Sequence, residues 1–409
     1  MAASPAAPRD PLALPPVPPP APATHPWRDR IVAALFALAV ALPGLALVAT
    51  WSRTTTRFEN RPTAPWPAWS TAATKPRDFT AAFERAFADR FGGRDALIRL
   101  HHGVKAVAFG VSPVPNVMLG REGWLYFLGE DGKSLDRHFR GSEPFTDREI
   151  DALVTELGRR RDFLAARGIG YVVAVVPDKF TIYPEHLPAG VARMPATPLD
   201  RAAAALARDP RMHFVDLRAP LAAAKVKERL YFLTDSHWNY NGAVVGYEAI
   251  MRAVQRALDD QGRARLPAIA APPRPPYAAG KDVYSGDLAT MLGLPRRFRE
   301  PDLAPLSKVL GEAATRCARR VDVPPEPLLY PPAQDPQAFE CATPGLPRAV
   351  VYRDSMAIPL VPLLAQNFSR SLFMSSRRLD PALIAREQPD VVIEELVERS
   401  LNAPAAFPI

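Results

Sequence analysis

The feature that most constrains this chain is a run without charged side chains near its N-terminus, from Ile31 to Ser52. A helix over this run would be about 33 Å long, enough to cross the roughly 30 Å hydrocarbon core of a bilayer. Trp27 and Trp51 flank the run, and tryptophan is common where a membrane-spanning helix meets the headgroups. We therefore predict one transmembrane helix over residues 27–52.

A cleaved signal peptide is the alternative to an uncleaved anchor. Its apolar run would be shorter, and Leu47 disrupts the small-x-small pattern that cleavage requires, so the anchor is favoured. Local charge does not decide the orientation, because arginines lie on both sides of the run: Arg28, Arg30, Arg53, Arg57 and Arg61. Since long domains translocate despite flanking charge, we expect the large C-terminal part outside the cytoplasm.

Proline divides the remaining sequence into segments. The chain has 409 residues and 47 prolines, which concentrate in residues 1–26 and in a second stretch at about 266–346. We expect a disordered tail over 1–26, a linker with amphipathic helices over 53–110, and one domain over 111–409 that contains the second proline-rich stretch as an insertion. The net charge of +8 comes without a basic run interleaved with aromatics, so nucleic-acid binding is not expected.

From residue 111 onward, β-branched runs alternate with amphipathic helical segments. Thr146 is expected to cap a helix over 146–168, and a second long helix is expected over 241–258. Expected strands cover residues 123–128, 169–177, 212–217, 230–233, 348–353, 371–375 and 390–396. This alternation predicts an α/β fold with a mostly parallel sheet covered by helices on both faces.

Cys317 and Cys341 are the only cysteines of the chain. No histidine or further cysteine joins them at metal-ligand spacing, so no metal site is expected there. In an exported protein they could form a disulfide that clamps the proline-rich insertion. Two buried free thiols are the alternative.

Two segments place reactive side chains where expected strands end, which is where sites form in an open α/β sheet. Asp235 and His237 follow the expected strand 230–233, and in an extended chain positions i and i+2 point the same way. Ser355 lies at the turn between the strand 348–353 and a helix expected to start near Met356. Together these residues could supply an acid, a base and a nucleophile. The alternatives are a serine that only caps its helix and a hydrogen-bonded core histidine.

The segments "TDSHWNYNGA", "YRDSM", "VVPDKFTIYPEHLP", "GREGWLYF" and "YSGDLATMLGLP" resemble the AlgJ/AlgX-like family of SGNH-hydrolase-like alginate O-acetyltransferases. The resemblance runs from about Phe58 to the C-terminus and is closer to the membrane-anchored branch. It implies a three-layer α/β/α domain in which Ser355 is the nucleophile, His237 the general base and Asp235 its orienting partner. It implies no cofactor.

The resemblance also implies a location and partners. The domain would lie in the periplasm, anchored to the inner membrane, and would transfer acetyl groups to an exopolysaccharide. An MBOAT-type membrane acyltransferase would supply the acetyl groups, because acetyl-CoA is cytoplasmic. A polysaccharide acetylesterase and a non-catalytic export scaffold are the alternative functions.

Further residues of these segments are weaker candidates. Lys179 and Tyr183 match a family segment, and either substrate contact or packing at the strand end would explain them. Arg353 is a further candidate for substrate contact; it replaces the glycine that many SGNH proteins carry two residues before the serine, which puts the oxyanion-hole geometry in question. Ser285 is a rival nucleophile, although no clear strand precedes it, and the flanking Asp282 and Asp287 show no metal-ligand spacing.

Overall fold

The computed structural model forms two compact units, residues 1–95 and 96–409, so the expected boundary between residues 110 and 111 falls inside the second unit. Nearly all of the expected N-terminal tail and much of the proline-rich insertion lie outside the described residues. The described residues are 26–52, 54–55, 62–91, 93–143, 145–262, 266, 283–301, 317–323 and 334–402.

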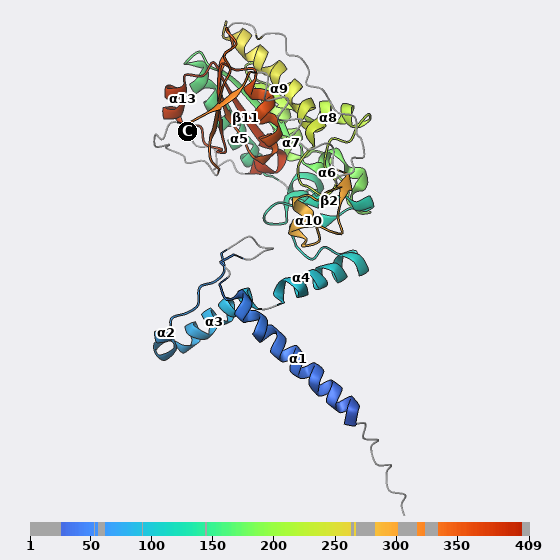
Figure 1. Ribbon diagram of the computed structural model, residues 1–409. Coiled ribbons are helices and arrows are strands. Elements are labelled where there is room, and N and C mark those ends of the chain that lie inside the picture. The colour runs from blue at the N-terminus through green and yellow to red at the C-terminus, as the bar shows by residue number, and fades with distance from the viewer. Residues whose placement is uncertain are drawn as a thin grey trace, which may run out of the picture. The chain divides into compact units, whose positions relative to one another are not determined.

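The first unit begins with α1 (Pro26–Thr50), which coincides with the predicted transmembrane helix (Figure 1). Among the described residues it is the one helix long and apolar enough to cross a membrane, and none of its most apolar stretch is buried. The helices α2 (Trp69–Thr74) and α3 (Pro76–Arg90) follow. This part of the chain therefore offers a candidate single-pass anchor.

Aromatic stacking organises the first unit after α1. The phenylalanines that recur every four residues along α3 form a ladder, with ring centroids of Phe79 and Phe83 6.1 Å apart. Trp66 lies against Phe83 and also stacks on Trp51 at 4.5 Å. Arg90, at the end of α3, donates hydrogen bonds to the carbonyl oxygens of Trp51 and Ala64. These contacts hold the segment after α1 against α3.

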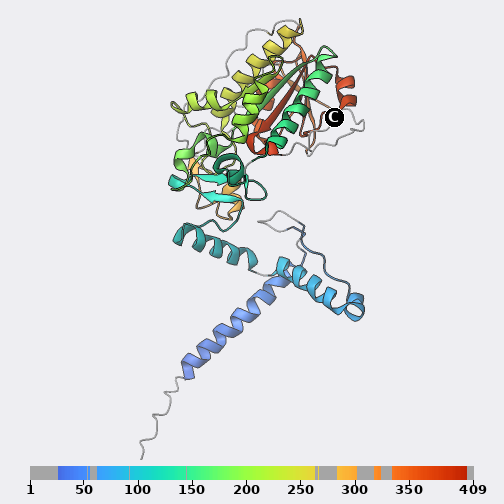
Figure 2. The ribbon, with the colours of Figure 1, turned by 180° about the vertical axis from the view of Figure 1, so that it is seen from behind.

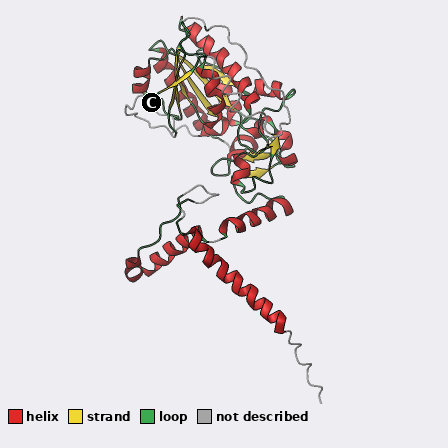
Figure 3. Cartoon of the chain, viewed as in Figure 1, coloured by secondary structure: helices red, strands yellow, loops and turns green. Residues whose placement is uncertain are grey.

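The second unit is built on one twisted sheet, drawn in yellow in Figure 3. Five neighbouring strands are parallel, and two antiparallel strands extend one edge. In spatial order they are β4 (His213–Asp216), β3 (Gly170–Val176), β11 (Val391–Val397), β9 (Arg348–Tyr352), β10 (Arg370–Met374), β8 (Gln337–Glu340) and β7 (Arg319–Val321). The mostly parallel sheet predicted from the sequence is confirmed.

Helices cover both faces of this sheet, as Figure 2 shows from behind. One face packs against α8 (Arg218–Lys225), α9 (Tyr240–Asp260) and α12 (Val361–Ala365), and the other against α5 (Asp147–Ala165), α7 (Pro198–Leu206) and α13 (Pro381–Glu387). Successive side chains of β3 alternate between the two cores, which explains why its whole β-branched run is buried. The result is the expected three-layer α/β/α arrangement.

Helix capping agrees with the sequence. Thr146 caps α5 and forms a capping box with Glu149. Asn239 caps α9 by accepting a hydrogen bond from the N–H of Gly242. This cap fixes the direction in which the chain enters α9, and it therefore helps to position His237, two residues earlier.

A smaller substructure combines a segment that precedes the sheet strands in the sequence with a segment that lies between them in the sequence. Its hairpin β1 (Val117–Leu119) and β2 (Leu125–Phe127) packs on α10 (Asp287–Met291), and β5 (Val283–Tyr284) pairs with β6 (Glu300–Pro301). Ahead of it lie α4 (Arg94–Gly103) and the π-helix η1 (Val104–Ala108). Short helical turns complete the described elements: η2 (Arg121–Gly123), η3 (Asp136–Arg140), α6 (Lys179–Ile182), η4 (Pro184–His186), η5 (Ser355–Leu360) and η6 (Glu398–Asn402).

The strand expected over 230–233 is not formed. Only an isolated bridge joins Tyr231 to Trp238, and the chain between them bends. The backbone groups of this segment bond mostly to side chains and within the bend; the carbonyl oxygen of Leu233 also accepts from the N–H of Leu125 in β2 at 2.9 Å.

Candidate active site

Two segments far apart in the sequence meet at the carboxyl ends of the parallel strands. The loop before α9 carries Asp235 and His237, and the turn after β9 carries Ser355, the first residue of η5. Trp238 links the two, because its buried indole N–H donates a hydrogen bond to the carbonyl oxygen of Met356 at 2.7 Å. The histidine loop and the serine turn are therefore fixed to each other.

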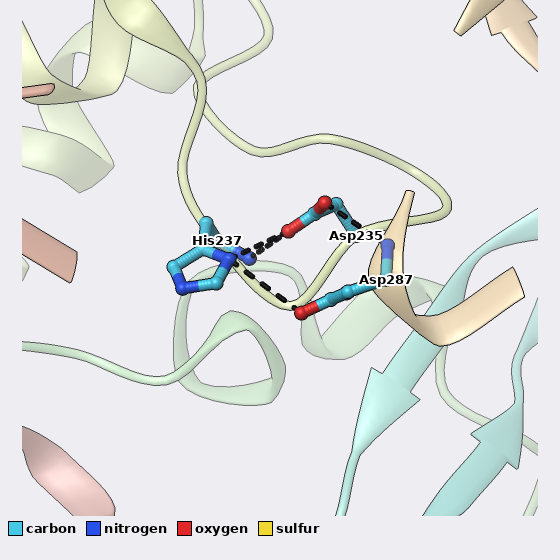
Figure 4. A group of neighbouring side chains, drawn as sticks. All are labelled: Asp235, His237 and Asp287. Atoms are coloured by element: carbon cyan, nitrogen blue, oxygen red, sulfur yellow. Dashed lines mark hydrogen bonds and ion pairs between the residues drawn. The ribbon is translucent and has the colours of Figure 1, made fainter. Parts of the chain in front are cut away.

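Asp235 holds the imidazole of His237 through two hydrogen bonds to one oxygen. Its Oδ1 accepts from the backbone N–H of His237 at 3.0 Å and from Nδ1 at 2.7 Å, as Figure 4 shows. The two side chains meet because the chain bends at residues 234–237, not because an extended strand aligns them. An Nδ1–H that donates to the carboxylate leaves Nε2 as a hydrogen-bond acceptor.

Ser355 completes a continuous chain of hydrogen bonds. Its Oγ lies 2.9 Å from Nε2 of His237, on the side of the ring opposite Asp235. Asp354 fixes the turn, since its carboxylate accepts from the N–H of Met356 at 2.8 Å and from that of Val397 at 2.8 Å. The arrangement from Asp235 through His237 to Ser355 has the geometry that transfers a proton from a hydroxyl to an imidazole.

The segment from β5 to α10 supports Asp235 from behind. Tyr284 donates its hydroxyl hydrogen to Oδ2 of Asp235 at 2.5 Å, and the N–H of Asp287 donates to the same oxygen at 3.1 Å. Gly286 lies so close that a Cβ there would be 2.5 Å from the Cβ of Asp235. Only glycine fits this position without displacing Asp235.

Asp287 brings a second carboxylate to the histidine. Its Oδ2 lies 3.6 Å from Nδ1 of His237 (Figure 4). It also accepts a hydrogen bond from the hydroxyl of Ser236 at 2.5 Å, and its Oδ1 accepts from the N–H of Ser236 at 2.7 Å. Asp287 therefore adds negative charge beside the imidazole while it holds the loop.

Two buried charged side chains clamp the backbone of the histidine loop. The ammonium group of Lys179 donates to the carbonyl oxygens of Phe232 and Asp235, at 2.9 and 2.5 Å. The carboxylate of Glu300 accepts from the N–H groups of Leu233 and Thr234, at 2.9 and 2.8 Å. These bonds replace the strand pairing that the sequence suggested for residues 230–233, and they explain why the loop can bend.

The electrostatic environment favours a charged aspartate and a basic histidine. Burial alone would raise the pKa of Asp235, but the hydrogen bonds from His237 and Tyr284 outweigh it and hold that pKa below its usual value. Burial alone would lower the pKa of His237, but the hydrogen bond and charge of Asp235, with the charge of Asp287, leave it raised. Burial and the charge of Asp235 raise the pKa of Asp287. The pKa shifts of Asp235 and His237 thus follow mainly from their hydrogen-bonded pairing, and that of Asp287 from burial beside a second carboxylate.

A cavity of about 560 Å³ opens beside His237 and Ser355. Its wall includes Asp287 and two guanidinium groups, from Arg377 and Arg399. Arg399 is paired with Asp178, and Arg377 donates to the carbonyl oxygen of Ser400. The cavity has room for a sugar residue and contains both polar donors and apolar walls, as small-molecule sites do.

Asp235, His237 and Asp287 also present three potential metal-ligand atoms within 4.8 Å of one another. The oxygens of both carboxylates already accept hydrogen bonds from protein groups. The hydrogen bonds therefore satisfy this cluster without an ion, and we treat it as a proton-transfer site.

Lys179 and Tyr183 lie beneath the loop and do not line the cavity. Lys179 is 3% exposed, and burial lowers its pKa to about 7. Tyr183 packs against Trp124 with tilted rings whose centroids are 4.4 Å apart, and its hydroxyl oxygen accepts from the N–H of Leu230. Of the two readings of these residues, the contacts favour packing over substrate binding.

Arg353 and Ser285 also lie away from the reacting atoms. Arg353 is buried, donates to the carbonyl oxygen of Asp354 and does not line the cavity. The hydroxyl of Ser285 donates to the carbonyl oxygen of Phe298 at 3.1 Å. Among the described residues, the serine that contacts Nε2 of His237 is Ser355.

The two cysteines lie together at one edge of the sheet. Cys317 and Cys341 form a disulfide with their Cα atoms 4.9 Å apart. Cys317 precedes β7 and Cys341 follows β8, so the bond links the two antiparallel edge strands.

Sequence reasoning missed the supporting residues Tyr284, Gly286, Asp287 and Glu300. All four lie about 50 residues or more after His237 in the chain, and only the β5–β6 pairing and α10 bring them under the loop. The one available signal was the segment "YSGDL", whose Asp287 had no recognisable metal-ligand spacing.

Comparison with known proteins identifies relatives. Residues 117–320 match the family described as SGNH hydrolase-like domain, acetyltransferase AlgX; Asp235 and His237 lie inside this match and Ser355 outside it. Proteins named probable alginate O-acetylase AlgJ are similar: the one from Pseudomonas putida is 32% identical over 207 residues, covering 49% of this chain and 48% of that protein. The one from Pseudomonas syringae is 30% identical over 184 residues, 45% and 43% of the two chains.

This chain thus spans about half the length of the curated relatives it matches. Among solved structures, the O-acetyltransferase domain of Pseudomonas putida AlgJ superposes with a TM-score of 0.42 at 22% identity, covering 70% of this chain and 93% of that one. Bacillus cereus PatB1 superposes with a TM-score of 0.45 at 16% identity, covering 70% and 96%. On the family match and the curated relatives, residues 117–320 belong to the family of SGNH hydrolase-like domains that includes the acetyltransferase AlgX.

Proposed function

We propose that this protein is a membrane-anchored O-acetyltransferase that acetylates hydroxyls of an exopolysaccharide through an acetyl-serine on Ser355. The observation that carries the proposal is the hydrogen-bonded chain from Asp235 through His237 to Ser355 on the wall of a cavity. The similarity to proteins named probable alginate O-acetylase supports acetyl transfer to a polysaccharide of the alginate type.

The reaction has two halves that use the same base. In the first, His237 takes the proton from Oγ of Ser355 as that oxygen attacks the carbonyl carbon of an acetyl ester, and the departing alcohol receives the proton from Nε2. In the second, His237 deprotonates a sugar hydroxyl, which attacks the acetyl-serine, and the proton then returns to Oγ. Asp235 keeps the imidazole in the reactive tautomer and stabilises its charged form in both halves.

The donor must reach this site from outside the cytoplasm if α1 is an anchor with the second unit in the periplasm. Acetyl-CoA is cytoplasmic, so an MBOAT-type membrane acyltransferase is the proposed source of acetyl groups. The apolar length of α1 supports the anchor, and the orientation is part of the proposal.

The test is acetyl transfer from a small activated ester to an oligosaccharide, measured with four variants: Ser355→Ala, His237→Ala, their double mutant and Asp235→Asn. Each of the first two should lower the rate by about 10³-fold or more, and the double mutant should lose little further, because the two residues act as one unit. Asp235→Asn should retain more activity, since it changes no reacting atom.

The matched control is Ser285→Ala, whose hydroxyl bonds to a carbonyl oxygen away from the histidine. It should transfer acetyl at near the wild-type rate. A Ser355→Ala protein that keeps its thermal stability and transfers acetyl normally would refute the proposal. Release of acetate with no transfer to any offered sugar would instead assign the site to an acetylesterase.

A further inference from the structure

A row of exposed apolar side chains runs along α4, η1 and the turn that follows in the second unit. Leu97, Leu100, Val104 and Val107 recur every three to four residues, which places them on one side of the helical segment, and Phe109 and Val111 follow in the turn after it. They are between 46% and 71% exposed: Leu97, Leu100, Val104, Val107, Phe109 and Val111. Isolated exposed apolar side chains are ordinary, but a contiguous row of this length marks an interaction surface.

The opposite side of the same helix is attached to the body of the second unit. Nδ1 of His102 donates a hydrogen bond to the carbonyl oxygen of Leu292 at 2.6 Å. Leu292 is fully buried and directly follows α10, whose first residue, Asp287, lines the cavity. The exposed row is therefore one face of a helix that is held in place through its other face.

The charges around the row are positive. The cations beside the row are Arg99 and Lys105, and the first turn of α4 adds Arg94 and one acidic residue, Asp95, so residues 94–111 carry a net positive charge. Neither Arg99 nor Lys105 belongs to the row, and long cationic side chains beside an apolar face can extend to the headgroups while their stems cover apolar surface. A helical segment with one apolar face, basic flanks and a net positive charge has the composition of helices that lie in the interface of an anionic bilayer.

The chain itself favours a membrane over a protein as the occupant of this face. The row starts at Leu97, 47 residues after α1 ends at Thr50 (97 − 50), and α1 is the candidate membrane span. A tether of this length keeps the second unit close to the bilayer, so even weak interfacial binding would be populated. The net positive charge of residues 94–111 suits anionic lipid headgroups directly.

We propose that the apolar row of α4 and η1, Leu97 to Val111, lies in the headgroup region of an anionic bilayer and is a second membrane contact of this protein. Through His102 and Leu292 this contact orients the cavity relative to the membrane surface. The inference goes beyond acetyl transfer, and it rests only on the proposed insertion of α1.

The full-length protein in lipid nanodiscs of phosphatidylethanolamine and phosphatidylglycerol provides the test. Because Cys317 and Cys341 are joined in a disulfide, one introduced cysteine can carry a single nitroxide label. Labels at Leu100→Cys and Val107→Cys are compared with Val226→Cys, an 84% exposed position of the same unit outside the row. Paramagnetic relaxation by oxygen and by an aqueous nickel complex reports the depth of each label.

We expect the oxygen-to-nickel collision ratio at positions 100 and 107 to exceed that at position 226, and to fall when phosphatidylglycerol is replaced by phosphatidylcholine. Labels at 100 and 107 that are as accessible to nickel as the label at 226 would overturn the inference. So would labels shielded from both reagents, which would indicate a protein partner. A chain that does not co-elute with nanodiscs would refute the insertion of α1, and with it this inference and the membrane anchor of the proposed function, without affecting the proposed chemistry at Ser355.

Discussion

Glu300→Gln tests whether the clamp on the histidine loop stabilises the fold. The Glu300 carboxylate is fully buried, and each oxygen has two donors: Oε1 accepts from the N–H and hydroxyl of Thr234, and Oε2 accepts from the N–H of Leu233 and faces Arg229 at 2.9 Å. Glutamine has the same shape but no charge, and its amide nitrogen must replace one of these oxygens.

The less costly orientation of this glutamine points its amide group at Thr234, whose hydroxyl can turn to accept. The buried N–H of Thr234 then loses its acceptor, at a cost of about 1–3 kcal/mol, and the bonds at the other oxygen lose their charge. With the weakened pair to Arg229, the total is about 3–5 kcal/mol, the range measured when one partner of a buried ion pair is removed. At roughly 2 °C per kcal/mol for a domain of this size, Tm should fall by about 6–10 °C.

Thermal melts followed by circular dichroism measure this difference. Glu340→Gln is the matched control, because Glu340 pairs with Arg370 at 3.0 Å on a side chain that is 44% exposed. An exposed pair contributes about 0–1 kcal/mol, so the control should melt within about 2 °C of wild type. If the Tm of Glu300→Gln equals that of the control variant, Glu300 does not clamp the loop as described.

Three further predictions concern the site and the sheet edge. Asp287→Asn removes a negative charge beside the general base and so lowers its pKa; the acid limb of the pH–rate profile should move to lower pH, and an unchanged profile would contradict the electrostatic account. Gly286→Ala should abolish most acetyl transfer, because the new Cβ would lie 2.5 Å from that of Asp235, and a variant with normal kinetics would show that the site tolerates the displacement. The disulfide of Cys317 and Cys341 should stabilise by about 3 kcal/mol and appear as linked peptides in mass spectrometry without reduction, whereas two alkylated thiols would exclude it.

The strands of the sheet could be predicted because strands buried on both faces consist of continuous runs of apolar, often β-branched, residues. The runs that became β3, β9 and β11 are rich in valine, and they are buried on both faces between the two helical layers. The run at 230–233 is equally apolar, although it contains no β-branched residue, and it forms no strand. Its backbone is bound by Lys179 and Glu300, whose positions depend on the tertiary fold and leave no local pattern.

The residues of the candidate site also include some that could be predicted from the sequence and some that could not. Asp235, His237 and Ser355 could be proposed from short-range motifs and a family resemblance, and the structure brings them within hydrogen-bond distance. The role of Asp287 could not be predicted, because it depends on how residues 283–301, inside the proline-rich stretch, fold back under the loop. Lys179 has two interpretations, substrate contact and packing at the strand end, and its burial favours packing.

The most direct test of the central claim is to trap the acetyl-enzyme. The purified protein is incubated with an activated acetyl ester in the absence of any sugar acceptor, digested, and analysed by mass spectrometry. We predict one acetyl group on the peptide that contains Ser355, lost when an acceptor oligosaccharide is added and absent from His237→Ala. Acetylation of a different residue that transfers to the acceptor, or full transfer activity with no acetylated Ser355, would contradict the account.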